Sequence, residues 1–184
     1  MINKDQAWQL LREAELVHDE DTVNRAVRRL AIDITAKLGD SLPLVMPVMG
    51  GAVVFTGQLL PLLRFPLEFD YLHVTRYDGK TRGGQIQWKT KPHMDIRGRT
   101  VLVLDDILDE GITLAAIRQK LLEMGAATFY SGVFADKDLG KKKPVTADFV
   151  GVTVPNRYVF GFGMDAYGLW RNLPAIYALK NENK

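Results

Sequence analysis

Residues 101–114 read VLVLDDILDEGITL and join an apolar strand, a run of acids and the start of a helix. The four apolar residues at 101–104 form the short run that is typical of a strand covered on both faces. Asp105 and Asp106 follow directly, and the turn Asp109-Glu110-Gly111 comes next. Glycine lets a turn approach a ligand closely, and the N–H groups at the start of a helix attract phosphate. The stretch therefore predicts a phosphate-binding turn between a buried strand and a helix.

Three carboxylates fall close together in this stretch, at Asp105, Asp106 and Asp109. An acidic turn by itself is more simply explained as a solvated strand end followed by a helix cap. Three carboxylates side by side repel one another unless a cation or a hydroxylated ligand compensates. We therefore expect Asp105 and Asp106 to bind ribose hydroxyls or magnesium, and Thr113 to donate a hydroxyl or cap the helix.

Strand and helix patterns alternate along most of the chain. Apolar residues recur at helical spacing over residues 5–17, 19–38, 52–63 and 112–124. Strand-like runs occupy residues 42–49, 67–77, 100–104, 127–135, 149–154 and 158–162. The polar residues 78–93 are expected to form a long mobile loop or a hairpin. The alternation predicts an α/β fold, a mainly parallel sheet flanked by helices on both faces, with ligands at the carboxyl ends of its strands.

Composition excludes several classes of protein. The 184 residues include no cysteine, which excludes a disulfide scaffold, thiolate metal sites and a cysteine nucleophile. With 24 basic and 22 acidic residues the net charge is +2, too small for a field that draws in nucleic acid. No apolar run approaches the roughly 20 residues of a membrane span, and residues 1–15 lack a signal-peptide core. We expect one domain, a cytoplasmic location, and neither a membrane nor a nucleic-acid partner.

The acidic stretch resembles the signature with which type I phosphoribosyltransferases bind phosphoribosyl diphosphate (PRPP). Residues 134–171 resemble the purine end of the hypoxanthine-guanine phosphoribosyltransferases, because Lys137 lies 28 residues after Asp109 and Tyr158-Val159 follow at the expected distance. Residues 48–51 resemble the pyrophosphate loop of that family, which often carries a non-proline cis peptide. The resemblance runs from about Leu42 to Leu173.

This resemblance implies the type I phosphoribosyltransferase fold, with a core at about 40–140 and a small hood from about 1–39 and 141–184. It implies a glycosyltransferase of purine salvage, which uses Mg²⁺ to transfer the phosphoribosyl group of PRPP to N9 of hypoxanthine or guanine. The products would be a nucleoside monophosphate and pyrophosphate. Relatives of this kind are usually homodimers or homotetramers.

The resemblance also assigns roles to residues. Asp109 becomes the general base near purine N7, and Asp105 and Asp106 hold the ribose hydroxyls. The 5′-phosphate would lie in the turn Asp109, Glu110, Gly111, Ile112 and Thr113, and pyrophosphate would contact Met49, Gly50 and Arg171. The purine site would comprise Lys137 at the 6-oxo group, Tyr158 stacked on the ring, Val159 with its backbone groups, and Asp165. Magnesium would be bound by Asp165 with Asp105 and Asp106, and Arg76 and Tyr77 would open a mobile loop that closes as a lid.

Four residues depart from the family pattern. Glu110 replaces a serine or threonine, Met49 stands where many relatives carry lysine, Arg76 replaces a serine, and Asp105 replaces a common glutamate. Without the resemblance, Lys137 would be read as a solvated lysine, Tyr158 as a core residue, and Asp165 with Arg171 as a surface ion pair. Two other functions remain open: a PRPP- or nucleotide-sensing regulator on the same fold, and a phosphoribosyltransferase for xanthine.

Overall fold

A computed structural model describes residues 2–76 and 86–180. The helices are α1 (Lys4–Glu13), α2 (Glu20–Leu38), α3 (Val53–Leu59), the 3-10 turn η1 (Leu60–Leu62) and α4 (Ile112–Glu123). The strands are β1 (Glu15–His18), β2 (Leu44–Met49), β3 (Glu68–Phe69), β4 (Leu72–Arg76), β5 (Ile86–Thr90), β6 (Thr100–Leu108), β7 (Thr128–Lys137), β8 (Phe149–Val154), β9 (Val159–Phe160) and β10 (Ile176–Ala178). None of the helices in these ranges is long and apolar enough to span a membrane.

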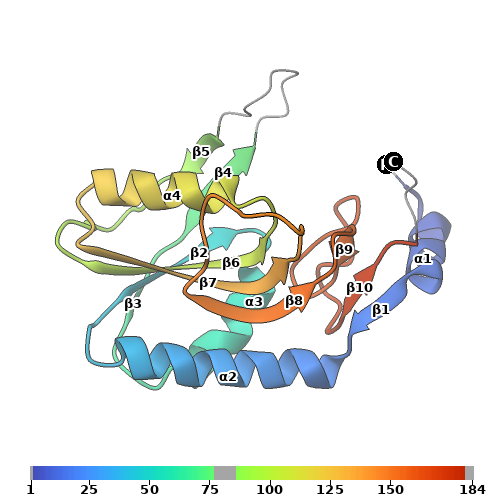
Figure 1. Ribbon diagram of the computed structural model, residues 1–184, viewed down its shortest axis with the longest axis horizontal. Helices are drawn as coiled ribbons and strands as arrows, with labels where there is room; N and C mark the ends of the chain where they lie inside the picture. The colour runs from blue at the N-terminus through green and yellow to red at the C-terminus, as the bar shows by residue number, and fades with distance from the viewer. Residues whose placement is uncertain (1, 77–85, 181–184) are drawn as a thin grey trace.

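The larger sheet has the order β5-β4-β2-β6-β7-β8, and β3 also pairs with β2. Every pairing in it is parallel except that of β5 with β4, so the expected mainly parallel sheet is confirmed. Helices α2 and α3 lie on one face and α4 on the other (Figure 1). The carboxyl ends of β2, β6 and β7 therefore meet at one edge of the sheet.

Strand β6 shows why its sequence is apolar without alternation. Leu102 and Leu104 join the core beneath α2 and α3, whereas Val101 and Val103 join the core beneath α4. Because successive side chains of a strand point to opposite faces, a sheet covered on both faces needs apolar residues at every position. The strand continues to Leu108, four residues beyond its expected end, so Asp105 and Asp106 belong to the strand itself.

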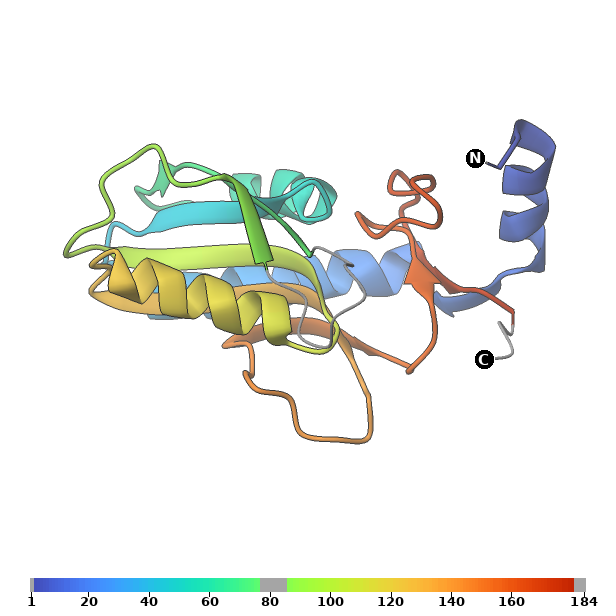
Figure 2. The same cartoon turned by 90° about the horizontal axis from the view of Figure 1, so that it is seen from above.

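The chain ends form a second, smaller sheet with the order β1-β10-β9. Figure 2 shows α1 and this sheet at one end of the molecule, beyond the main sheet. The helix expected over residues 5–17 ends at Glu13, because Leu16 pairs with Tyr177 of β10, a strand that the sequence pattern did not indicate. Helix α2 packs on the main sheet, and β8 is the edge strand of that sheet. Both elements therefore lie outside the small sheet, although the resemblance assigned residues 1–39 and 141–184 to the hood.

The helix expected over residues 19–38 is confirmed, with Asp19 as its N-cap and Gly39 as its C-cap. The strand expected over residues 67–77 is interrupted at Asp70, whose side chain accepts hydrogen bonds from the N–H groups of Tyr71, His93 and Met94. Strand β5 runs antiparallel to β4, which confirms a hairpin in this region. Tyr77 and most of the proposed lid lie outside the described residues.

Candidate functional site

Two adjoining cavities open where the carboxyl ends of the central strands meet the turn after β9. The first has a volume of about 440 Å³ and the second about 220 Å³. Four residues line both: Asp106, Ile107, Asp109 and Asp165. The two cavities are therefore neighbouring parts of one site.

Nearly all of the candidate residues line one cavity or the other. The first is lined by Met49, Gly50, Asp105, Asp106, Asp109, Glu110, Gly111, Ile112, Thr113, Asp165 and Arg171. The second adds Lys137, Tyr158 and Val159. Arg76 ends β4, where it pairs with Ile86. Met49 and Arg171, which are 122 positions apart in sequence, thus share one site.

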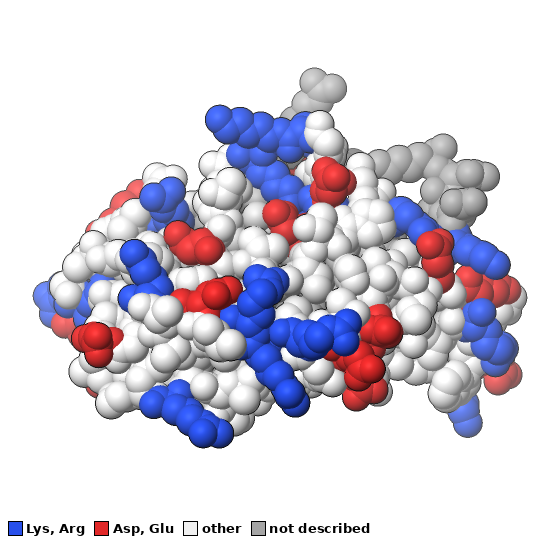
Figure 3. All heavy atoms as spheres, turned by 60° about the horizontal axis from the view of Figure 1, so that its bottom comes forward, with Lys and Arg blue, Asp and Glu red and all other residues white. Residues whose placement is uncertain are grey.

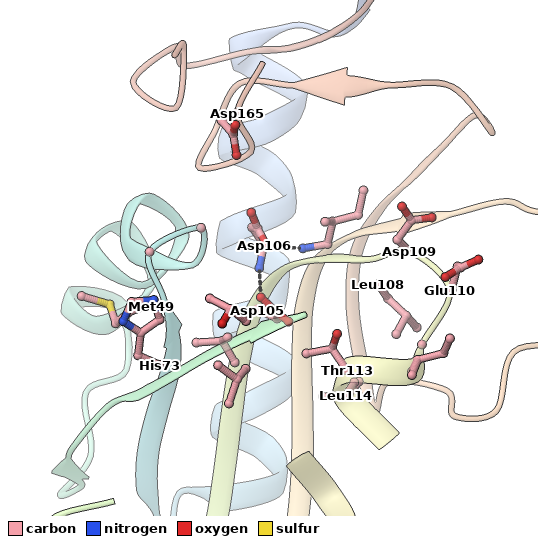
Figure 4. A pocket seen from close by; sticks show the side chains of 18 of the residues that line it. Met49, His73, Asp105, Asp106, Leu108, Asp109, Glu110, Thr113, Leu114 and Asp165 are labelled. Carbon is pink, nitrogen blue, oxygen red and sulfur yellow. Dashed lines mark hydrogen bonds between the residues drawn. The ribbon is translucent and has the colours of Figure 1, made fainter. Parts of the chain in front are cut away.

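Asp105 and Asp106 stand at the floor of the first cavity (Figure 4). Burial, and next the negative charge of Asp106, raises the pKa of Asp105 well above its ordinary value. Burial also raises the pKa of Asp106, although a hydrogen bond with Asp105 and the positive charge of Arg171 lower it in part. Two carboxyl groups held in this way are suited to a cation or to ribose hydroxyls, which would relieve their repulsion.

The loop after β2 lies directly against Asp106. The Met49–Gly50 peptide is cis, as the resemblance implies. A Cβ on Gly51 would lie 2.0 Å from Oδ2 of Asp106, so no larger residue fits there without displacing the carboxylate. A Cβ on Gly163 would likewise lie 2.1 Å from the carbonyl oxygen of Gly51, so the turn after β9 touches this loop.

The turn of residues 109–111 leads into α4. Gly111 is the N-cap of α4 in the left-handed conformation, with φ of 80°, and no side chain caps the helix. The alternative that Thr113 is the cap is therefore wrong, although Thr113 lines the cavity. The positive end of the helix dipole faces the same cavity, an arrangement that favours an anion.

Lys143 contacts this turn through a hydrogen bond and through packing. Its ammonium donates to the carbonyl oxygen of Leu108 at 2.6 Å and pairs with Oδ1 of Asp136 at 2.5 Å. Only 10% of its side chain is exposed. A Cβ on Gly111 would lie 3.4 Å from Cβ of Lys143, so the lysine packs against the turn. Sequence reasoning did not single out Lys143, because no local signal distinguishes it from Lys141 and Lys142.

Lys137 and Asp109 form an ion pair across the second cavity, with Nζ 2.9 Å from Oδ2. The Lys137 side chain is only 13% exposed, which contradicts the alternative of a solvated lysine. Tyr158 is 44% exposed and stacks on Tyr167, with ring centroids 6.3 Å apart and an interplanar angle of 11°. Tyr158 is therefore a surface of the cavity and not a core residue.

Arg171 links the turn after β9 to strand β6. It pairs with Asp165 at 2.5 Å, donates to the carbonyl oxygen of Gly163 at 2.6 Å, and lies 3.9 Å from Asp106. Asp165 in turn accepts a hydrogen bond from the N–H of Gly168. The pair lines the cavity and is only partly exposed, so it differs from an ordinary surface ion pair.

Sequence reasoning missed other residues that line the site, among them His73, Val74, Thr75 and Met164. His73 and Thr75 come from β4, and the strand pattern there carried no sign that its end borders the site. Met164 directly precedes Asp165, and no local sequence signal marked it.

The acids of the first cavity fit a magnesium ion only in part. In residues 2–76 and 86–180, no three His, Asp or Glu side chains lie close enough together to hold a metal by themselves. Mg²⁺ usually keeps several waters and takes one or two carboxylates together with substrate phosphates. Asp105, Asp106 and Asp165 border one cavity and suit that mode of binding.

Comparison with known proteins identifies the family. The phosphoribosyl transferase domain matches residues 14–167. The chain belongs to the phosphoribosyltransferase family. This phosphoribosyltransferase is 36% identical over 166 residues to the hypoxanthine-guanine-xanthine phosphoribosyltransferase of Tritrichomonas foetus, covering 90% of this chain and 91% of that protein. It is 32% identical over 162 residues to the hypoxanthine-guanine phosphoribosyltransferase of Bacillus subtilis, covering 88% and 90%.

Solved structures agree with this assignment. A hypoxanthine phosphoribosyltransferase from Staphylococcus aureus superposes on this phosphoribosyltransferase with a TM-score of 0.86 and 26% identity, covering 98% of this chain and 97% of that one. A hypoxanthine-guanine-xanthine phosphoribosyltransferase superposes with a TM-score of 0.83 and 33% identity, covering 91% and 97%. The expected family and the type I phosphoribosyltransferase fold are confirmed.

Proposed function

We propose that this phosphoribosyltransferase transfers the phosphoribosyl group of PRPP to N9 of hypoxanthine or guanine and releases pyrophosphate. The observation that carries the proposal is the pairing of the two cavities. One offers two carboxyl groups and a helix N-terminus to a phosphorylated sugar, and the other offers Lys137 and Tyr158 to a planar base. Asp109 borders both and so stands where sugar and base would meet.

The sugar is held by groups on β6 and the turn that follows. Asp105 and Asp106 accept hydrogen bonds from the ribose hydroxyls, and the N–H groups of the turn and Thr113 hold the 5′-phosphate. Met49, Gly50 and Arg171 border the place of the diphosphate. Asp105, Asp106 and Asp165 would hold magnesium, which when bound neutralises charge on the leaving diphosphate.

The base is oriented by the second cavity. The ammonium of Lys137 donates to a 6-oxo group, and Tyr158 stacks on the ring. When a purine enters, Lys137 exchanges Asp109 for the carbonyl oxygen, so Asp109 is released to accept the purine proton. The N9–ribose bond then forms while the bond to diphosphate breaks, and the proton that leaves the purine ends on Asp109.

The two other functions are less well supported. A regulator that binds RNA or DNA needs a basic surface, yet acidic and basic side chains are interspersed on the face shown in Figure 3. A xanthine enzyme needs the same contacts to the 6-oxo group, so it differs from our proposal only in its preference at purine C2. We also propose a cytoplasmic homodimer or homotetramer, in keeping with the resemblance.

A spectrophotometric assay with PRPP, magnesium and each of four purines tests the proposal. We expect turnover of hypoxanthine and guanine, with xanthine as the measure of the second candidate and adenine as the negative control. Comparable turnover of adenine and hypoxanthine would overturn the role of Lys137. Salt-sensitive binding of RNA without pyrophosphate release would favour the regulator.

A further inference from the structure

The first cavity carries an excess of acidic side chains for a site that receives a diphosphate. Five carboxyl groups line it: Asp105, Asp106, Asp109, Glu110 and Asp165. Among the described lining residues, Arg171 is the permanent cation, and it already pairs with Asp165. A bound diphosphate therefore needs more positive charge than Arg171 supplies.

His73 is the other basic side chain that the described part of the chain places on this lining. It lies on β4 directly opposite Met49 of β2, so the two side chains share one face of the sheet. Figure 4 shows both side chains at the edge of the cavity, beside the loop that begins at Gly50. The ring is thus placed next to the loop where the diphosphate is expected.

The three histidines differ in what their rings contact. The ring of His18 bonds to the carbonyl oxygen of Thr153 at 2.8 Å, and Nδ1 of His93 lies 3.2 Å from Oδ1 of Asp70. His73 makes no hydrogen bond or ion pair with any residue in the described ranges. Its ring is half-buried and uncommitted, so it is available to a ligand in the cavity.

We propose that His73 binds the diphosphate group of PRPP and of the released pyrophosphate as an imidazolium cation. The inference rests on the proposed function and adds a residue to its leaving-group site. Within the described part of the chain, the positions paired with His73 carry no charge: they are Met49 on β2 and Thr90 on β5. Lys89, the next residue of β5, is exposed. The cavity acids and Arg171 are the charged groups across from the ring.

Calorimetric binding of pyrophosphate with magnesium tests this assignment. An imidazole changes its charge between about pH 5 and pH 8. We expect His73→Gln to weaken binding at least tenfold at about pH 6 and much less at about pH 8, relative to the wild type at the same pH. The comparison at equal pH matters because phosphate groups titrate in this range as well. His18→Gln is the matched control and should bind as the wild type does.

His73→Lys keeps a cation in place and should bind tightly at both pH values, which provides a second test if the glutamine variant does not fold. Binding by His73→Gln equal to that of the wild type at both pH values would refute the inference. So would a lysine variant that keeps the pH dependence of the wild type. Pyrophosphate binding is measured without a purine. The result for His73 can therefore be interpreted even if the transfer assay shows no activity.

Discussion

Replacing Lys143 by methionine tests whether this lysine stabilises the turn of residues 109–111. The change keeps most of the aliphatic stem and removes the ammonium that bonds to Leu108 and Asp136. Removing one partner of a buried ion pair costs about 3–5 kcal/mol. The Asp136 side chain is 36% exposed and can be rehydrated, so we expect a loss near the lower end, about 3 kcal/mol.

For a chain of this size, each kcal/mol lowers Tm by about 2–4 °C, so Lys143→Met should unfold about 6–12 °C below the wild type. The turn would also lose its anchor at the Leu108 carbonyl, so the KM for PRPP should rise more than that for the purine. Thermal unfolding and steady-state kinetics measure the two effects. Lys142→Met, at an exposed neighbouring position, is the matched control. A Tm within about 2 °C of that control, with unchanged KM for PRPP, would refute the reasoning.

Three other substitutions test the site. Asp109→Ala should lower kcat at least tenfold with an unchanged circular dichroism spectrum, because general base catalysis contributes about 10²–10⁴-fold, and full activity would contradict the assignment. Lys137→Met should raise the ratio of adenine to hypoxanthine kcat/KM at least tenfold, measured with both bases at fixed PRPP; an unchanged ratio would exclude Lys137 from base selection. Asp105→Asn should raise Tm by a few degrees near neutral pH while PRPP binding is lost. The pKa of Asp105 is raised in the folded state, so the folded protein retains a proton that the unfolded chain releases, and stability falls as pH rises toward the folded pKa. Unfolding curves at about pH 5 and pH 8 should show the gain at the higher pH, and an equal Tm for both proteins there would count against this account.

The main sheet was predictable because burial on both faces leaves a simple trace in sequence. The apolar run at 101–104 serves two cores at once, and the glycine of the turn occupies a left-handed conformation that favours glycine. Strand β1 was not predictable, because residues 14–17 fit a helical period and become a strand only through pairing with β10. Local pattern cannot show a partner that lies about 160 residues away.

Some residues of the candidate site could be predicted from local sequence, and others could not. Asp105, Asp106 and Asp109 are adjacent in sequence and could be grouped by electrostatic reasoning alone. Lys137 and Tyr158 needed the resemblance, because only the fold brings the end of β7 and the start of β9 to Asp109. His73 and Lys143 were missed, since the first lies on a strand with no local motif and the second in a run of similar lysines.

The contact between Gly163 and the carbonyl oxygen of Gly51 has a consequence for engineering the protein. The turn that carries Met164 and Asp165 into the proposed base-binding cavity also contacts the loop at the proposed diphosphate site. If the turn at residues 161–165 were replaced by that of a relative, we would therefore expect weaker binding of the diphosphate. Exchanging the loop at residues 49–51 together with the turn should avoid this loss. On the proposed function, the segments for base preference and for leaving-group binding would have to be exchanged together, although about 110 residues separate them.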